Sequence, residues 1–458
     1  MNKYFNYFLS VNFAVVLLCF FAFAIGIATF IENDYGTTTA KALIFNSWWL
    51  ELCLILLCCI FIYNIYKYKL HKIQKLPVLL LHLSFILIII GAGLTRYIGK
   101  EGSMRIREGS LNNQFVSETV FLDFKFHDNK TEYVGQKPLL LSSLSNNKFI
   151  IPIKFNQNEI SIEYVDFIHD PVDEILLNQQ DGDDFIELIF PKENGGMKSE
   201  YIIKNGIRRF QDLDFSFNNQ SGDIKIFKTD SVFQFVSSYD VSFMKMSDQS
   251  NGLLNANQTH IFNQKTLYTI NGKNFVFKNY LTKGLLIKKS NSIKNDNSKI
   301  DLLKIKLNVN DLDTIIDLYG YKGLVSPKTY LSLNGLFISL SYGSINYSLP
   351  FAIKLKDFQL DRYPGSDSPS SFASEIEVID KDKKFDYRIF MNNVLNYRGY
   401  RFFQSSYDND EKGTILSVNK DRVGTFVTYS GYLSLLLSVI FVVISRFSRF
   451  NLLSKKLK

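Results

Sequence analysis

Cysteine is scarce in this chain of 458 residues, and all four cysteines lie inside long apolar runs. They are Cys19, Cys53, Cys58 and Cys59. No CxxC pair is present, which argues against thiol–disulfide exchange by this chain. Cys58 and Cys59 would point in different directions on a helix, so we interpret them as small apolar packing residues rather than metal ligands.

Histidine is nearly as scarce, with five in the chain. Three of them, His127, His169 and His260, are isolated in a long polar stretch without metal-ligand spacing, so we expect surface or structural roles there. His71 lies in a basic loop, where a solvated side chain is expected. The sequence also has no nucleotide-binding motif, no P-loop and no hydrolytic triad, so no short motif marks the chain as an enzyme by itself.

Apolar residues make up 46% of the chain and concentrate in four runs. These runs cover about 8–31, 48–66, 77–97 and 426–444. Each is close to the roughly 20 residues that a membrane-spanning helix needs. The first is longer than the apolar core of a secretory signal, and its cleavage-like Ala22–Ala24 lies in mid-run, so we expect a retained helix.

The basic residues predict an orientation for these runs, because positively charged loops stay on the cytoplasmic side. The loop between the second and third runs and the tail after the fourth carry Lys67, Lys69, Lys72 and Lys75, then Arg446, Arg449, Lys455, Lys456 and Lys458. The loop between the first two runs, with Glu32, Asp34 and only Lys41, is expected outside. With four spans, successive segments then alternate between the cytoplasmic and the outer side. A third run that was instead a buried helix of a soluble domain would break this alternation. The formal charge of +8 therefore reflects topology, and we expect no nucleic-acid partner.

The stretch from about 98 to 423 has the composition of a β-rich domain. Segments rich in Val, Ile, Phe and Tyr are Phe115–Phe126, Lys148–Phe155 and Ile300–Val309. Gly399–Tyr407 and Thr414–Asn419 flank a polar loop and are typical of a hairpin. The sequence thus predicts an integral membrane protein with four transmembrane helices and a large β-rich extracytoplasmic domain between the third and fourth. Its parts are a membrane region (1–97), this domain (98–423), and the last helix with a basic cytoplasmic tail (424–458).

His82 lies within the third apolar run, about five residues and roughly 7–8 Å past Pro77 at its cytoplasmic start. An imidazole at that depth is costly and needs a protein or ligand partner. One interpretation is a histidine hydrogen-bonded to a neighbouring helix, or one whose side chain reaches back to the membrane interface. The other is an axial ligand to haem iron, which neutral imidazole commonly provides. Gly91, Ala92 and Gly93 on the same run permit close helix packing. These residues leave both interpretations of His82 open.

Four segments together resemble the ResB (CcsB) family of System II cytochrome c biogenesis. They are Phe23–Trp49, the third apolar run followed by Gly99–Gly109, Leu349–Asp380, and Phe390–Asp408 followed by the last run. They occur in family order within the family's topology, and the middle of the chain carries little resemblance. One departure is Val394, where proline is more usual in the family.

The resemblance implies a bacterial inner-membrane subunit, with its large domain on the outer, periplasmic face. With a CcsA-type membrane protein it would deliver haem across the membrane and support its covalent attachment to the CxxCH motifs of apocytochrome c. It places His82 as the axial ligand of haem b, which is the transported substrate. The family's tryptophan-rich motif belongs to the partner, and this chain has only Trp48 and Trp49.

The expected chain is therefore one subunit of a cytochrome c synthetase (haem lyase) complex and not catalytic alone. Its expected partners are the CcsA-type protein, apocytochrome c, haem and membrane lipid. The alternative function is a membrane-anchored binding or assembly module with no haem role, in which His82 is structural. The haem spectrum of the purified complex discriminates the two functions.

Overall fold

The computed structural model describes residues 7–192, 195–219, 221–230, 232–294 and 298–445. The predicted basic tail, 446–458, lies outside the described residues. Among those residues, four helices are long and apolar enough to cross a membrane by length and composition. The helical elements are α2 (Val11–Tyr35), α3 (Thr37–Ala40), the π-helix η1 (Lys41–Phe45), α4 (Trp48–Lys67), the 3₁₀ turn η2 (Ile73–Lys75), α5 (Leu76–Ile98) and α6 (Arg422–Ile444).

The helix boundaries follow local signals. Ser10 caps α2 by accepting a hydrogen bond from the Phe13 amide (3.2 Å), and Ser47 caps α4 in the same way. Gly36, with φ of 86°, ends α2. Pro77 occupies the first turn of α5, where its missing N–H is not needed.

Between α5 and α6 the chain is built of strands. It folds as two compact units, Met1–Asp170 with Ser292–Lys458, and Pro171–Asn291. The second unit lies within the stretch 98–423, which was predicted as one β-rich domain.

The first unit contains a ten-stranded and a four-stranded antiparallel sheet. The ten-stranded sheet has the order β23-β22-β21-β2-β1-β26-β25-β24, with β20 beside β21 and β3 beside β2. Its strands are β1 (Lys100–Arg107), β2 (Leu111–His127), β3 (Glu132–Leu139), β20 (Thr329–Leu333), β21 (Leu336–Arg362), β22 (Pro369–Asp380), β23 (Lys383–Phe390), β24 (Leu395–Tyr397), β25 (Tyr400–Tyr407) and β26 (Gly413–Lys420). The smaller sheet has the order β19-β18-β5-β4, formed by β4 (Ile150–Phe155), β5 (Asn158–His169), β18 (Asp301–Val309) and β19 (Leu312–Gly320).

The second unit, Pro171–Asn291, also holds two sheets. The first is β15-β12-β11-β10-β9, formed by β9 (Ile207–Phe210), β10 (Leu213–Phe217), β11 (Ile224–Thr229), β12 (Val232–Ser237) and β15 (Thr259–Ile261). The second is β14-β13-β16-β17-β7-β8 with β6 beside β17, formed by β6 (Pro171–Leu176), β7 (Asp183–Pro191), β8 (Met197–Ile203), β13 (Val241–Lys245), β14 (Asn251–Leu254), β16 (Thr266–Ile270) and β17 (Lys273–Ser290). Phenylalanines dominate the core of this unit.

The strands expected from the sequence are present. Phe115–Phe126 lies in β2, and the segments from 148 and from 300 form β4 and β18. In β18 the alternating Leu303, Ile305 and Leu307 are buried, as expected of a strand with one face on a core. The predicted hairpin is also present, since β25 and β26 pair antiparallel on either side of the polar loop.

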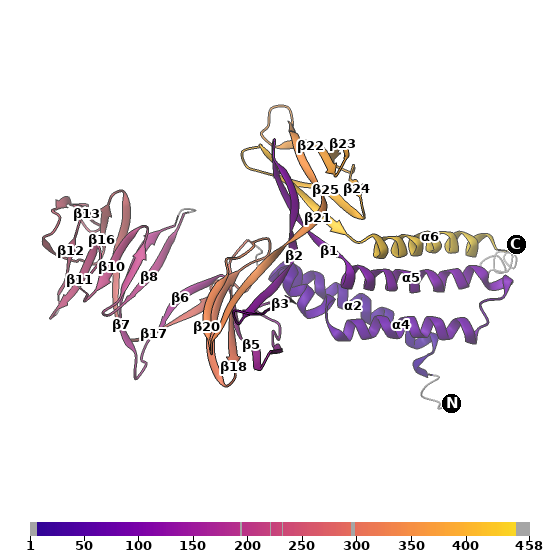
Figure 1. Ribbon diagram of the computed structural model, residues 1–458, viewed down its shortest axis with the longest axis horizontal. Coiled ribbons are helices and arrows are strands. Elements are labelled where there is room, and N and C mark those ends of the chain that lie inside the picture. The colour runs from indigo at the N-terminus through magenta and orange to yellow at the C-terminus, as the bar shows by residue number, and fades with distance from the viewer. Residues whose placement is uncertain (1–6, 193–194, 220, 231, 295–297, 446–458) are drawn as a thin grey trace. The chain divides into compact units, whose positions relative to one another are not determined.

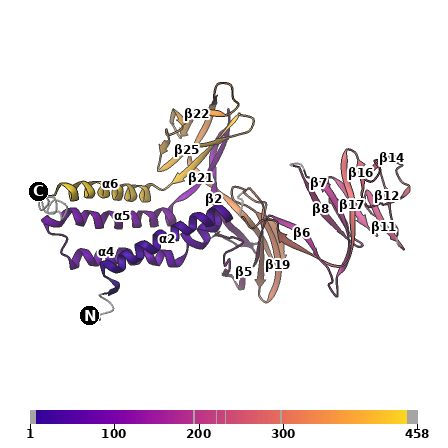
Figure 2. The same cartoon turned by 180° about the vertical axis from the view of Figure 1, so that it is seen from behind.

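α5 and α6 form a helix pair that continues directly into a strand pair (Figure 1). Gly91 of α5 packs against the backbone of Thr428, and Gly431 of α6 packs against Ile88. α5 leads into β1 and β26 leads into α6, and these two strands pair antiparallel over their full length. Figure 2 shows the same continuity from behind, with α4 and α2 on the side of α5 that faces away from α6.

Candidate functional site

His82 lies on α5, and its ring orientation is set by the helix backbone. Nδ1 lies 2.9 Å from the carbonyl oxygen of Val78, one turn earlier. A carbonyl only accepts, so Nδ1 carries the proton in the neutral ring and Nε2 keeps its lone pair. This is the tautomer that metal-ligating histidines adopt, with one ring nitrogen donating to a carbonyl and the other free to ligate.

Two phenylalanines form an apolar surface beside the imidazole. The ring of Phe61, from α4, meets the His82 ring edge-on with centroids 5.6 Å apart. Phe61 also stacks on Phe85, with centroids 5.7 Å apart. Phe85 is 38% exposed, and His82 is half-buried, so the group opens toward the outside of the described helices.

The apolar residues that follow His82 on α5 do not share one surface. Phe85 lies in the aromatic group, while Ile86 is buried among the helices and Ile89 packs against the cluster that contains Leu57 and Ile60. The apolar contact next to His82 is therefore made by Phe85 stacked with Phe61. No pattern in the sequence indicates Phe61, because it comes from a different helix.

The arrangement suits one axial ligand and one apolar face of a porphyrin. The imidazole offers a lone pair, and the aromatic rings offer an apolar contact for a planar macrocycle. Within the described ranges, no three His, Cys, Asp or Glu side chains gather as a metal centre. A haem on His82 would be held through this one ring nitrogen, with the rings of Phe61 and Phe85 beside it.

A second feature is a cavity of about 540 Å³ at the end of α5 that leads into β1. Cations from four places line it, namely Lys41 of η1, Arg96 of α5, Lys100 of β1 and Lys322, which follows β19. Arg96 forms an ion pair with Glu51 (2.8 Å) and donates to the Phe45 carbonyl oxygen (3.3 Å). This volume is within the usual range of small-molecule sites.

The far wall of this cavity holds a buried polar group. Nδ1 of His169 lies 2.6 Å from Oδ1 of Asp301, and the hydroxyl of Tyr342 also bonds to Asp301. Burial raises the pKa of Asp301, although the hydrogen bond from His169 acts in the opposite direction. Burial also raises the pKa of Tyr342 well above its ordinary value. Of the two roles expected for His169, the structure supports a structural one, since the residue is 1% exposed.

The other two isolated histidines make local contacts. Nδ1 of His127 accepts from the Asn129 amide (3.2 Å), and Nε2 of His260 lies 2.9 Å from the Asn255 carbonyl oxygen. Both contacts are exposed and within five residues of the histidine.

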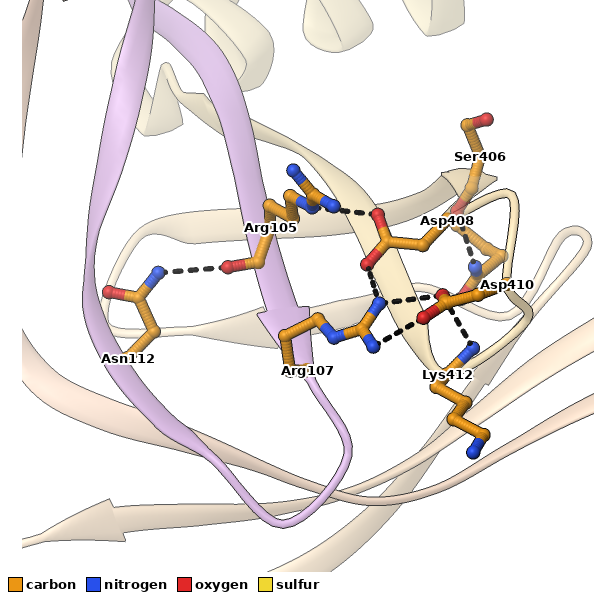
Figure 3. A network of polar contacts seen from close by, with 8 residues as sticks. Arg105, Arg107, Asn112, Ser406, Asp408, Asp410 and Lys412 are labelled. Atoms are coloured by element: carbon orange, nitrogen blue, oxygen red, sulfur yellow. Dashed lines mark hydrogen bonds and ion pairs between the residues drawn. The ribbon is translucent and has the colours of Figure 1, made fainter.

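Two of the segments that suggested a family meet in a charged network (Figure 3). Asp408, which follows β25, accepts from Arg105 Nε and Arg107 Nη1 of β1, each at 2.7 Å. Arg107 also donates a bidentate pair of hydrogen bonds to Asp410, from Nη1 to Oδ1 at 2.6 Å and from Nη2 to Oδ2 at 2.5 Å. The Asp408 side chain is 4% exposed, whereas both arginines are exposed. This network closes the β25–β26 hairpin onto β1 and so stabilises the strands next to α5 and α6.

Comparison with known proteins agrees with the resemblance seen in the sequence. Residues 315–438 match the model of the ResB-like family, a stretch that ends within α6. Over 451 residues, or 98% of this chain, the sequence is 28% identical to Protein NrfI of Wolinella succinogenes. The chain spans 36% of the length of that relative. The similarity to the ResB-like family is thereby confirmed.

Proposed function

Starting from this similarity, we propose that the chain is a membrane subunit of cytochrome c biogenesis that holds haem through His82. With a CcsA-type partner it delivers haem b across the bacterial inner membrane and supports its attachment to apocytochrome c. The observation that supports this proposal is the ring geometry of His82. Nδ1 is hydrogen-bonded to the Val78 carbonyl oxygen, and Nε2 has no hydrogen bond among the described residues. In a purely structural role, Nε2 would still be left without a partner in the apolar part of a membrane, which is unfavourable.

The open side of this site supports the need for a partner. Phe85 is exposed beside His82, and large apolar exposure in a membrane helix is covered by lipid, ligand or protein. A partner helix on this side would supply the second axial ligand and enclose the porphyrin. The greater length of the relative accords with the fusion of two subunits in one chain that occurs in some members of the family.

The proposed orientation rests on the loop charges. The basic loop from Lys67 to Lys75 joins α4 to α5 at the helix ends opposite β1. If this loop is cytoplasmic, α5 and α6 carry the β sheets to the outer, periplasmic side. His82 then lies near the cytoplasmic end of α5, and the cavity lined by Lys41, Arg96 and Lys100 lies at the outer end.

This chain's own residues supply binding and positioning rather than thioether chemistry. Haem provides the vinyl groups and the iron, and apocytochrome c provides the thiols. His82 holds the iron on one side and Phe61 and Phe85 exclude water from the porphyrin face. The described residues include no thiol pair outside the apolar helices, so attachment is a property of the complex.

The test is haem content of the complex co-purified with its partner. His82→Ala should lower haem per protein and cytochrome c maturation, and added imidazole should restore part of both by filling the vacant ligand position. His82→Cys should retain some haem with a shifted Soret band. His71→Ala, in the basic loop, is the matched control and should leave both unchanged. Unchanged haem content and spectrum in His82→Ala would refute the proposal and favour the assembly module.

A further inference from the structure

Two lysines face each other where the apolar helices meet the sheet. Lys100 is the first residue of β1 and Lys420 the last of β26, and their Cα atoms are directly paired in the antiparallel ladder. Lys100 follows the end of α5 at Ile98 by two residues, and Lys420 precedes the start of α6 at Arg422 by two. The pair therefore lies at one level, just beyond both helix ends.

The two ammonium groups lie over aromatic rings. Lys100 Nζ lies 4.5 Å from the Tyr347 ring centre, and Lys420 Nζ lies 4.8 Å from that of Tyr400. Both rings contact Phe115, with centroid distances of 5.2 and 6.3 Å. Cation–π contacts orient the lysines but do not neutralise them.

The nearby carboxylates have other hydrogen-bond partners. Asp421 accepts from the Thr95 hydroxyl (2.5 Å) and from the Gly424 amide (3.0 Å), where it caps α6. Glu101 accepts from the Asn419 side chain at 3.3 Å. Throughout the part of the chain that the structure describes, neither lysine forms a salt bridge. Like charges directly opposite in a sheet are destabilising, so the pair favours an anion between or above the two groups.

Further cations and apolar groups adjoin the pair. Lys41 and Arg96 line the same cavity as Lys100. A second cavity, of about 480 Å³, is lined by Tyr400, Asp421 and the α6 residues Arg422, Phe426 and Tyr429. Phe426 and Tyr429 are exposed along the first turns of α6. A cationic group thus lies next to an apolar helix surface. A phospholipid has the matching arrangement, with a charged headgroup followed by apolar acyl chains.

The helix lengths place the pair at headgroup depth. α5 and α6 each have 23 residues, and such helices are about 34 Å long, close to the hydrocarbon thickness. Two strand residues add roughly 6–7 Å, and the headgroup layer is about 5–8 Å deep. If both helices cross the membrane, the ammonium groups lie among the phosphates of one leaflet.

We propose that Lys100 and Lys420 form a binding site for the phosphate of an anionic phospholipid in the outer leaflet, with Arg422 beside them and the acyl chains on α6. The proposal rests on the membrane-spanning part of the proposed function but not on haem binding by His82. The site would fix the depth of the α5–α6 pair and hold the sheet against the membrane surface. Lysine binds phosphate as a point charge, and the rings of Tyr347 and Tyr400 orient the two ammonium groups.

The experiment uses the full chain, exchanged into dodecylmaltoside and titrated with phosphatidylglycerol or phosphatidylcholine, with bound lipid counted by native mass spectrometry. Phosphatidylglycerol should bind the unaltered chain more tightly. In Lys100→Gln/Lys420→Gln its affinity should fall by about fivefold for each lysine removed, and Lys100→Arg/Lys420→Arg should retain binding. The control is Lys130→Gln/Lys384→Gln, which removes two exposed lysines elsewhere in the same unit and should bind like the unaltered chain.

Equal loss of affinity in the control, or equal affinity for the two lipids, would overturn the proposal. So would a Gln variant that keeps its lipid but loses haem or the partner protein, because the anion would then be a porphyrin or protein carboxylate. Haem content of the same preparations, read from the Soret band, separates failure of this site from failure of the His82 proposal.

Discussion

His169 and Asp301 are directly paired on the neighbouring strands β5 and β18, and Nδ1 of His169 donates to Oδ1 of Asp301 across 2.6 Å. Their side chains are 2% and 14% exposed. Because burial raises the pKa of Asp301, the carboxylate is less favourable in the folded protein than in the unfolded chain. The pair orders the wall of the cavity, and the charge of Asp301 reduces stability.

Substitutions of Asp301 should separate the hydrogen bond from the charge. Asp301→Ala leaves the ring N–H of His169 buried without its acceptor, which should cost about 1–3 kcal/mol of unfolding free energy. Asp301→Asn keeps an acceptor and should cost less. The raised pKa also predicts that stability falls as pH rises from the ordinary value through the folded one, and Asp301→Asn should remove this slope. Thermal unfolding of the purified chain across pH measures the loss of stability in each variant and the pH slope. Equal losses for Asp301→Ala and Asp301→Asn would contradict the hydrogen bond from His169 to Asp301.

The contribution of Asp410 to stability should change with pH in the direction opposite to that of Asp301. The hydrogen bonds and charge of Arg107 lower the pKa of Asp410 below its ordinary value. Its contribution to stability is therefore complete above the ordinary pKa and is lost as pH falls through the folded value. Asp410→Asn should make acid unfolding less steep at low pH while changing little near pH 7. An unchanged acid transition would show that the Arg107–Asp410 contact does not persist in solution.

Asp408 should matter more for stability than either arginine that it binds. Its carboxylate is buried and accepts from Arg105 and Arg107, whereas the arginines remain solvated when the acid is removed. Asp408→Ala should cost about 1 kcal/mol, the scale of a largely exposed ion pair, because solvent screens the arginine side. Arg105→Gln should cost less, since Asp408 keeps Arg107. Denaturant unfolding of the two variants gives the comparison, and the reverse order would contradict it.

Alanine substitutions of the two glycines near the end of α5, Gly91 and Gly93, should differ sharply in their effect on stability. A Cβ at Gly91 would lie 2.9 Å from the backbone nitrogen of Thr428, whereas a Cβ at Gly93 would meet nothing within 4 Å. Gly91→Ala should therefore separate α5 from α6 and cost about 1–3 kcal/mol. Gly93→Ala is the matched control and should be neutral or slightly stabilising. Thermal stability in detergent distinguishes them, and similar values for both variants would refute the observed packing.

The membrane topology can be tested by reporter fusions. Fusions at Asn46 and Asn251 should be external, and fusions at His71 and after Lys458 should be cytoplasmic, because the basic loops remain inside. A cytoplasmic reporter at Asn251 would refute the four-span orientation and the proposed function that depends on it. A predominantly intact protein in the membrane fraction is the control for each fusion.

The sequence by itself determined the elements whose signals are local. The four apolar runs became α2, α4, α5 and α6, because length and composition suffice to define such helices. The hairpin of β25 and β26 followed from two apolar segments around a polar loop. His82 was singled out as a candidate haem ligand for the same reason, since an imidazole within an apolar run can be recognised without any knowledge of its neighbours, and its role stays a prediction.

The tertiary structure alone decided which distant residues meet. Phe61 joins His82 because α4 packs beside α5, and His169 meets Asp301 because β5 pairs with β18. The pairing of Lys100 with Lys420 likewise depends on strand register. Side-chain periodicity specifies which face of a strand is buried, but many partners can satisfy one apolar face. The choice among them is made by the packing of the whole core and by contacts far apart in the chain.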